Sequence, residues 1–136
     1  MSRVAVVGIG RVGLPLALYL ADHGHHVVGL DVDAERVEAI QAGRMPFREE
    51  GAEEVMARVV AAGRFEATSD AVAAIGEAEV LILTLGTPVD EHLNPVFSSL
   101  EAVLSTLGPI LREGQLLILR STVSPGTTEY LRRYIE

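Results

Sequence analysis

Short apolar runs rich in β-branched residues alternate with stretches of helical periodicity along most of this 136-residue chain. The runs expected to form strands are 3–8, 26–31, 64–68, 79–85 and 115–120. The stretches expected to form helices are 12–23, 33–42, 53–62, 69–75, 98–111 and 127–135. Because the strands are almost continuously apolar and helices separate them, the pattern predicts a parallel sheet covered on both faces.

This alternation predicts an α/β fold of the Rossmann type, a doubly wound parallel sheet in three layers. The length predicts one domain over residues 1–136. In the doubly wound order a sixth strand lies beyond the fifth, so we expect the sheet to be truncated before that strand. The apolar residues 116–119 would then form an edge strand and favour a homo-oligomer, unless 127–135 folds over that edge.

Composition excludes several kinds of site and partner. The chain has no cysteine, which excludes disulfides, thiolate metal sites and a cysteine nucleophile within it. All 11 basic residues are arginines, so any side-chain cation that meets a phosphate here is an arginine. The net charge of −8 argues against a nucleic-acid partner. The apolar runs are far shorter than the roughly 20 residues of a membrane helix, and no signal peptide is visible, so we expect a cytoplasmic protein.

A glycine-rich turn lies between the first expected strand and the first expected helix. Its pattern, G-x-G-x-x-G, is typical of dinucleotide binding when a strand precedes it and a helix follows. The first glycine allows a tight turn, the second lets the backbone approach a pyrophosphate, and the third lets helix and strand pack closely. The candidate cofactor-binding residues of this turn are Gly8, Ile9, Gly10, Arg11, Val12 and Gly13.

Asp31 ends the second expected strand, 18 residues after the last glycine of the turn. A carboxylate at this place accepts hydrogen bonds from the adenosine ribose of NAD and repels the 2′-phosphate of NADP, so the residues predict NAD. Arg36 follows in the next helix, where it can either reach the adenosine or a phosphate or be a solvated helix residue. The residues alone slightly favour the solvated interpretation.

Further motifs follow in a specific order. Gly86-Thr87-Pro88 comes after the fourth expected strand, and Ser121-Thr122-Val123-x-x-Gly126-Thr127 comes after the fifth. With the glycine turn and Asp31-Val32-Asp33, these motifs resemble the N-terminal domain of the UDP-glucose/UDP-N-acetylmannosamine 6-dehydrogenase family. The resemblance covers essentially the whole chain, and the two later motifs are more specific than the glycine turn.

The resemblance implies an activity and a set of residues. Enzymes of this family oxidise the C6 alcohol of a nucleotide sugar to a carboxylate in two NAD-dependent steps. NAD contacts are implied at Val12, Asp31, Arg36, Thr87 and Thr122, and Thr122 is also implied as the catalytic residue of this chain. Thr87 and Thr122 follow the carboxyl ends of two strands, where open α/β sheets bind ligands. Their hydroxyls can donate to a ribose or phosphate oxygen, or orient a water.

The chain departs from the family pattern in two respects. Glu49-Glu50-Gly51-Ala52 stands where the family usually has Glu-Pro-Gly-Leu. The family's cysteine nucleophile and catalytic lysine lie beyond the segment that this chain resembles, and the chain has neither residue type. We therefore expect it to bind NAD without turnover, with a UDP-sugar substrate held by a domain that these residues do not include.

Other functions compete with this interpretation. A regulatory nucleotide-binding module of a potassium channel or transporter has a similar length and glycine turn but lacks the motifs around Thr87 and Thr122. Another β-hydroxyacid-type dehydrogenase is a third candidate. His23, His25 and His26 could suggest a metal, but histidines at a helix end explain them better, so we expect no metal site.

Overall fold

The computed structural model of this chain describes residues 2–10, 12–46, 50–84, 105 and 107–119. Strands and helices alternate along these ranges as the periodicity predicts. The elements are β1 (Arg3–Val7), α1 (Gly13–Asp22), β2 (His26–Leu30), α2 (Ala34–Gln41), α3 (Ala52–Ala61), β3 (Phe65–Thr68), α4 (Ala71–Ile75), β4 (Val80–Leu83) and β5 (Leu116–Leu119). Two helices begin at aspartate caps, because Asp33 accepts from the backbone N–H of Arg36 and Asp70 from those of Val72 and Ala73.

The strands form one parallel sheet in the order β3-β2-β1-β4-β5. This order confirms the predicted Rossmann-type sheet. The chain moves outward from β1 through β2 to β3, then crosses to β4 on the other side of β1. Because the order reverses beside β1, the carboxyl ends of β1, β2 and β4 border the place where open α/β sheets bind ligands.

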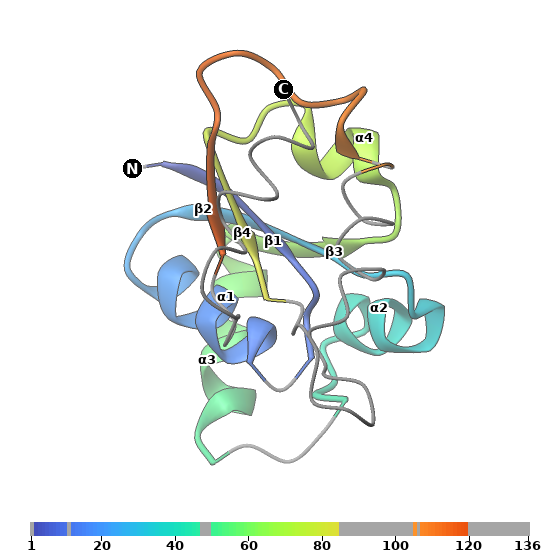
Figure 1. The fold of residues 1–136 in the computed structure, drawn as a ribbon. Coiled ribbons are helices and arrows are strands. Elements are labelled where there is room, and N and C mark those ends of the chain that lie inside the picture. The colour runs from blue at the N-terminus through green and yellow to red at the C-terminus, as the bar shows by residue number, and fades with distance from the viewer. Residues whose placement is uncertain (1, 11, 47–49, 85–104, 106, 120–136) are drawn as a thin grey trace, which may run out of the picture.

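Helices cover both faces of this sheet, which gives the predicted three layers. In Figure 1, α1, α2 and α3 lie on one side of the sheet and α4 lies on the other. Alternate residues of β1 separate the two apolar clusters: Val4 and Val6 pack with α1, α2 and α3, whereas Ala5 and Val7 pack with α4 and Leu107. Residues i and i+2 of a strand share a face, so this alternation is the direct consequence of the pleat.

β5 differs from the expectation of a strand with two buried faces. Leu117 and Leu119 pack on the α4 side, but Leu116 and Ile118 are 56% and 38% exposed. The expected helix 98–111 also ends earlier, because Ser105 and Leu107 are helical and a turn follows at 108–110. The expected helix 127–135 and the end of the fourth expected strand lie outside the described residues.

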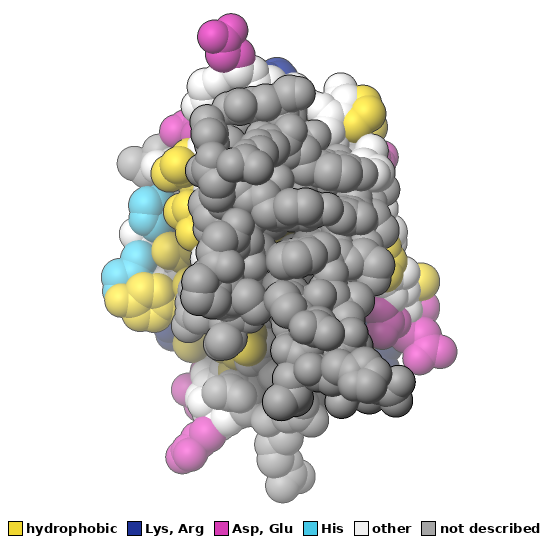
Figure 2. All heavy atoms as spheres, viewed as in Figure 1, with side chains coloured by type: hydrophobic (Ala, Val, Ile, Leu, Met, Phe, Trp, Pro, Cys, Tyr) yellow, Lys and Arg dark blue, Asp and Glu magenta, His cyan; other side chains and the backbone are white. Residues whose placement is uncertain are grey.

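The part of the chain that the structure describes has an acidic surface and contains no long apolar helix. In Figure 2, acidic side chains lie at several places around the margin of the visible face, in keeping with the net charge of −8. None of the helices in the described ranges is long and apolar enough to cross a membrane.

Candidate functional site

The glycine turn occupies the carboxyl end of β1, as the sequence predicts. Gly8 has a φ of +92°, a backbone conformation that favours glycine, and its N–H donates to the carbonyl oxygen of Leu30 at 2.8 Å. The turn therefore leaves β1 while still bonded to the end of β2. Arg11 lies outside the described residues.

Gly13, the third glycine of the turn, stands where α1 crosses closest to β1. A Cβ atom at this position would lie 1.7 Å from the carbonyl oxygen of Gly8 and 2.8 Å from Oγ1 of Thr84. No side chain larger than hydrogen fits between these groups. The expected reason for the third glycine, close packing of helix and strand, is therefore confirmed.

Thr84, directly after β4, supports the turn from the other side. Its hydroxyl lies 3.0 Å from the carbonyl oxygen of Val7 and 2.6 Å from that of Gly8. Sequence reasoning did not select Thr84. The available signal was its position at the end of an apolar strand, but its partner lies 76 residues earlier and appears only in the folded chain.

The N-terminus of α1 faces the turn, and its N-cap residue provides no side-chain cap. Val12 occupies the N-cap position with no side-chain hydrogen bond, and the first turn of the helix contains no acidic residue. The first N–H groups of a helix and its dipole together attract anions. This end of α1 is thus suited to a phosphate group, and Val12, half exposed, stands beside it.

Ile9 and Gly29 determine how the turn rests on the sheet. The Ile9 side chain is fully buried, and a Cβ atom at Gly29 in β2 would lie 2.7 Å from its Cγ2. Gly29 therefore makes room for Ile9. The side chain of Ile9 belongs to the core, and only its backbone N–H takes part in the polar site.

Asp31 joins the end of β2 to the glycine turn. Its Oδ2 accepts from the backbone N–H of Ile9 at 3.0 Å, and its Oδ1 accepts from that of Asp33 at 2.9 Å. Burial raises the pKa of this carboxyl, but the N–H groups of Asp33 and Ile9 and the Arg36 guanidinium outweigh burial and lower the pKa below its ordinary value. Asp31 is therefore an anion at neutral pH, held in a fixed position.

Arg36 is not a freely solvated helix residue. Its Nη1 lies 3.1 Å from Oδ2 of Asp31, and its Nη2 lies 4.0 Å from Oδ2 of Asp33. The same guanidinium is the nearest group to Gly10, 3.7 Å from where a Cβ atom would be. The solvated interpretation, slightly favoured by the residues alone, is wrong, because the structure brings Arg36 to the glycine turn.

The remaining candidates either lie elsewhere or fall outside the described ranges. Thr87 and Thr122, like Arg11, belong to the residues that the structure does not describe. His25 accepts from the N–H of Ser2, while His23 contacts the carbonyl oxygen of Tyr19 and the Tyr19 ring. Within the described ranges no group of three His, Cys, Asp or Glu side chains could hold a metal ion.

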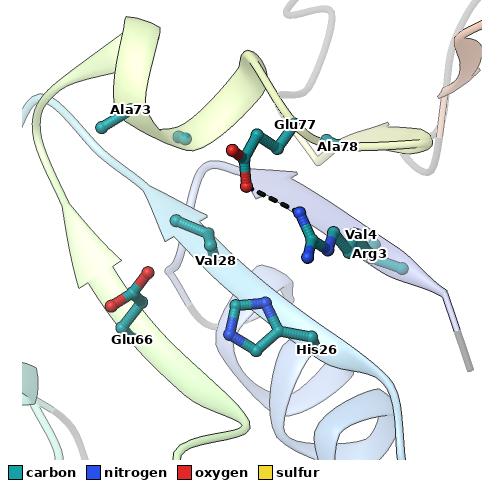
Figure 3. A pocket seen from close by; sticks show the side chains of 9 residues that line it. Arg3, Val4, His26, Val28, Glu66, Ala73, Glu77 and Ala78 are labelled. Carbon is teal, nitrogen blue, oxygen red and sulfur yellow. Dashed lines mark hydrogen bonds and ion pairs between the residues drawn. The ribbon is translucent and has the colours of Figure 1, made fainter.

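A small pocket lies between α4 and the sheet, away from the glycine turn. Figure 3 shows Arg3, His26 and Glu66 on three neighbouring strands beneath α4, with Arg3 paired to Glu77 at 2.6 Å. Its volume of about 70 Å³ is well below the roughly 300 Å³ at which ligand pockets begin. Arg3 and His26 begin their strands, so this pocket is at the opposite end of the sheet from Asp31.

Several known proteins are similar to this chain in sequence. Residues 2–136 match the family model described as the UDP-glucose/GDP-mannose dehydrogenase family, NAD binding domain. A UDP-N-acetyl-D-mannosamine dehydrogenase of Methanococcus aeolicus is 34% identical over 95% of this chain and 29% of its own length. A GDP-mannose 6-dehydrogenase of Pseudomonas putida is 32% identical over 93% of this chain and 30% of its own length.

Solved structures show the same relationship in three dimensions. A ternary complex of GDP-mannose dehydrogenase from Pseudomonas aeruginosa superposes with a TM-score of 0.92 at 30% identity, over 98% of this chain and 32% of that one. The UDP-linked N-acetylmannosamine dehydrogenase of Pyrococcus horikoshii has a TM-score of 0.91 at 33% identity, over 98% of this chain. This chain thus spans about 30% of the length of the curated relatives it matches.

Proposed function

Because this chain belongs to the UDP-glucose/GDP-mannose dehydrogenase family, as its NAD-binding domain, we propose that it is the cofactor-binding part of an enzyme that oxidises C6 of a nucleotide sugar to a carboxylate. We propose residues 1–136 as one domain for this purpose. When bound, NAD would supply the oxidising chemistry in two successive steps, with one NAD accepting one hydride from C6 in each. The described residues of this chain bind and orient that cofactor.

The observation that carries the proposal is the position of the Asp31 carboxylate beside the glycine turn. It is ionised, nearly buried, and bonded to the N–H of Ile9 inside the turn. A ribose diol donates hydrogen bonds to such a carboxylate when the pyrophosphate lies at the start of α1. The absence of a Cβ atom at Gly10 and the uncapped start of α1 fit the pyrophosphate.

We assign roles to the site residues on this basis. Gly8 and Gly13 shape the turn, Gly10 lets the pyrophosphate approach, Ile9 holds Asp31 through its N–H, and Val12 stands beside the phosphates at the start of α1. For Arg11 the support is the motif alone. Arg36 contacts the adenosine side of the site. For Thr87 and Thr122 the support is the motif alone: each follows a strand that ends at this edge, and Thr122 would orient a water or a reacting group.

The class of substrate is a further proposal. The relatives are named for both UDP-linked and GDP-linked sugars, so a nucleotide sugar is the common class, and the expected UDP group is the narrower choice within it. We propose that the sugar is bound mainly by parts of the enzyme beyond this chain. The names of these relatives favour a dehydrogenase over the regulatory channel module.

Titration calorimetry with NAD tests the proposed site. We expect NAD to bind this chain and NADP to bind more weakly, because Asp31 faces the 2′ position. The Asp31→Ala variant should lose about 1.5–3 kcal/mol of NAD binding free energy, as is typical for hydrogen bonds to a charged group. Glu66→Ala, at an exposed position of β3 in the pocket under α4, is the matched control and should bind NAD like the unmodified chain. Tighter binding of NADP than of NAD would contradict the assignment.

A further inference from the structure

Arg36 lies beside the carboxylate that is proposed to bind the adenosine ribose, and two carboxylates contact its guanidinium. Its Nη1 is 3.1 Å from Asp31 and its Nη2 is 4.0 Å from Asp33. The Arg36 backbone N–H donates to Oδ1 of Asp33 at 3.2 Å, so the start of α2 keeps this residue at the site whatever its side chain does. About a third of the side chain is exposed.

A guanidinium is the side chain best suited to a phosphate, because its planar array of N–H donors matches the phosphate oxygens. In dinucleotide-binding folds, a carboxylate after the second strand accepts from the ribose 2′-hydroxyl, whereas an arginine nearby accommodates a 2′-phosphate. This chain places both groups at the same spot and in direct contact. The Asp31 carboxylate, which is proposed to bind the ribose, thus already pairs with the guanidinium that could meet the 2′-phosphate of NADP.

We propose that Arg36 is a latent ligand for the 2′-phosphate of NADP, and that Asp31 selects NAD by engaging this guanidinium as well as by repelling the phosphate. The proposal rests on the proposed function, since it needs an adenosine bound beside the glycine turn. Its consequence is that a neutral residue at 31 releases Arg36. Asp33 is the weaker partner of Arg36, because its side chain is more exposed and its carboxylate is farther from the guanidinium.

The test compares NAD, NADP, 5′-AMP and 2′,5′-ADP in titrations of the chain and three variants. Asp31→Asn removes the charge and should raise the affinity for NADP and 2′,5′-ADP at least about tenfold, a change of about 1.4 kcal/mol. Adding Arg36→Gln to Asp31→Asn should abolish that gain, because the phosphate then has no guanidinium. Asp33→Asn is the matched control: asparagine caps a helix as well as aspartate, so the start of α2 is preserved. It should raise NADP binding much less than Asp31→Asn.

Folding is checked by circular dichroism and thermal melting, and Asp31→Ser is a second neutral variant in case asparagine destabilises the turn. An equal gain in NADP affinity with and without Arg36, or an equal gain from Asp33→Asn, would overturn the proposal. So would the absence of any gain in two folded neutral variants that still bind 5′-AMP. If the unmodified chain binds neither NAD nor 5′-AMP, the proposed function itself fails, which is distinguishable from failure of the Arg36 assignment alone.

Discussion

At the residue scale, the carboxylate of Asp31 holds together segments that are 22 residues apart in the sequence. It accepts from the glycine turn, from the start of α2 and from Arg36. Backbone N–H groups that lose contact with water must find an acceptor when the chain folds. The same side chain that completes the turn is the one proposed to bind the ribose.

Two of the three glycines of the turn, Gly10 and Gly13, should respond differently to substitution by alanine. Gly13→Ala places a Cβ atom 1.7 Å from the carbonyl oxygen of Gly8, so we expect a loss of about 1–3 kcal/mol or more in the free energy of unfolding. At Gly10 the nearest group is 3.7 Å away, so Gly10→Ala should leave the stability almost unchanged. It should still weaken NAD binding at least about tenfold, because the pyrophosphate needs close approach to the backbone.

Urea unfolding and NAD titration of both variants separate the two roles. A Gly10→Ala variant that binds NAD like the unmodified chain would show that the pyrophosphate does not lie over Gly10. A stable Gly13→Ala variant would show that α1 can move away from β1.

The ionisation of Asp31 should appear in the pH dependence of stability. Hydrogen bonds and Arg36 lower its pKa in the folded chain, against the effect of burial. The stabilisation is therefore present above its unfolded pKa of about 3.9, and is lost as the pH falls through the lower folded pKa. We expect Asp31→Asn to be less stable than the unmodified chain at neutral pH, with the difference shrinking below about pH 4. Urea unfolding at several pH values measures this, and a difference independent of pH would contradict it.

At the scale of elements, the ends of the strands matter more for the site than the strands themselves. Because β1, β2 and β4 run parallel, their carboxyl ends bring Gly8, Asp31 and Thr84 close together. Gln115 shows a similar effect at the amino end of β5, where its side-chain amide donates to the carbonyl oxygens of Ile75 and Ala78. Residues in turns and at strand ends thus form hydrogen bonds that hold neighbouring elements together.

β5 is the element that we expect to associate with a second copy. It ends the sheet order of the described strands, and Leu116 and Ile118 are exposed. An apolar edge strand without a charge or a proline favours pairing between chains. Ile118→Lys should shift the chain toward the monomer in light scattering, whereas Val72→Lys, at an exposed apolar position on α4, should not. A chain that is monomeric at all concentrations, before and after the substitution, would contradict the expected homo-oligomer.

At the scale of the whole molecule, the proposed reaction needs more functional groups than this chain contains. The resemblance implies a cysteine nucleophile and a lysine for this reaction, and the chain has neither residue type. The share of each relative that it spans, about 30%, is consistent with this division.

We therefore expect the 136-residue chain to bind NAD but to produce no NADH with UDP-glucose, UDP-N-acetylmannosamine or GDP-mannose. Absorbance at the NADH band during prolonged incubation measures turnover, and calorimetry on the same sample confirms that NAD is bound. Measurable NADH formation would require a mechanism without a cysteine nucleophile.

Much of the fold was predictable from local patterns. The period of the apolar residues identified β1 through β4 within a residue or two, and capping residues such as Asp33 and Asp70 marked helix starts. These signals are visible in sequence because they act between residues a few positions apart. The glycine turn and Asp31 were predictable for the same reason, since each stands at the end of a recognisable strand.

Only the tertiary structure decided which distant segments contact one another. The Arg36 guanidinium lies beside Gly10 because of how α2 is placed against the glycine turn, and the bond of Thr84 to Gly8 depends on the register of β4 against β1. The exposure of one face of β5 likewise depends on which helices reach it. The sequence by itself determined the elements, their order and the charge at the end of β2, because those follow from local spacing. The tertiary structure decided which side chains meet, because sheet register and helix packing bring together residues that no local pattern connects.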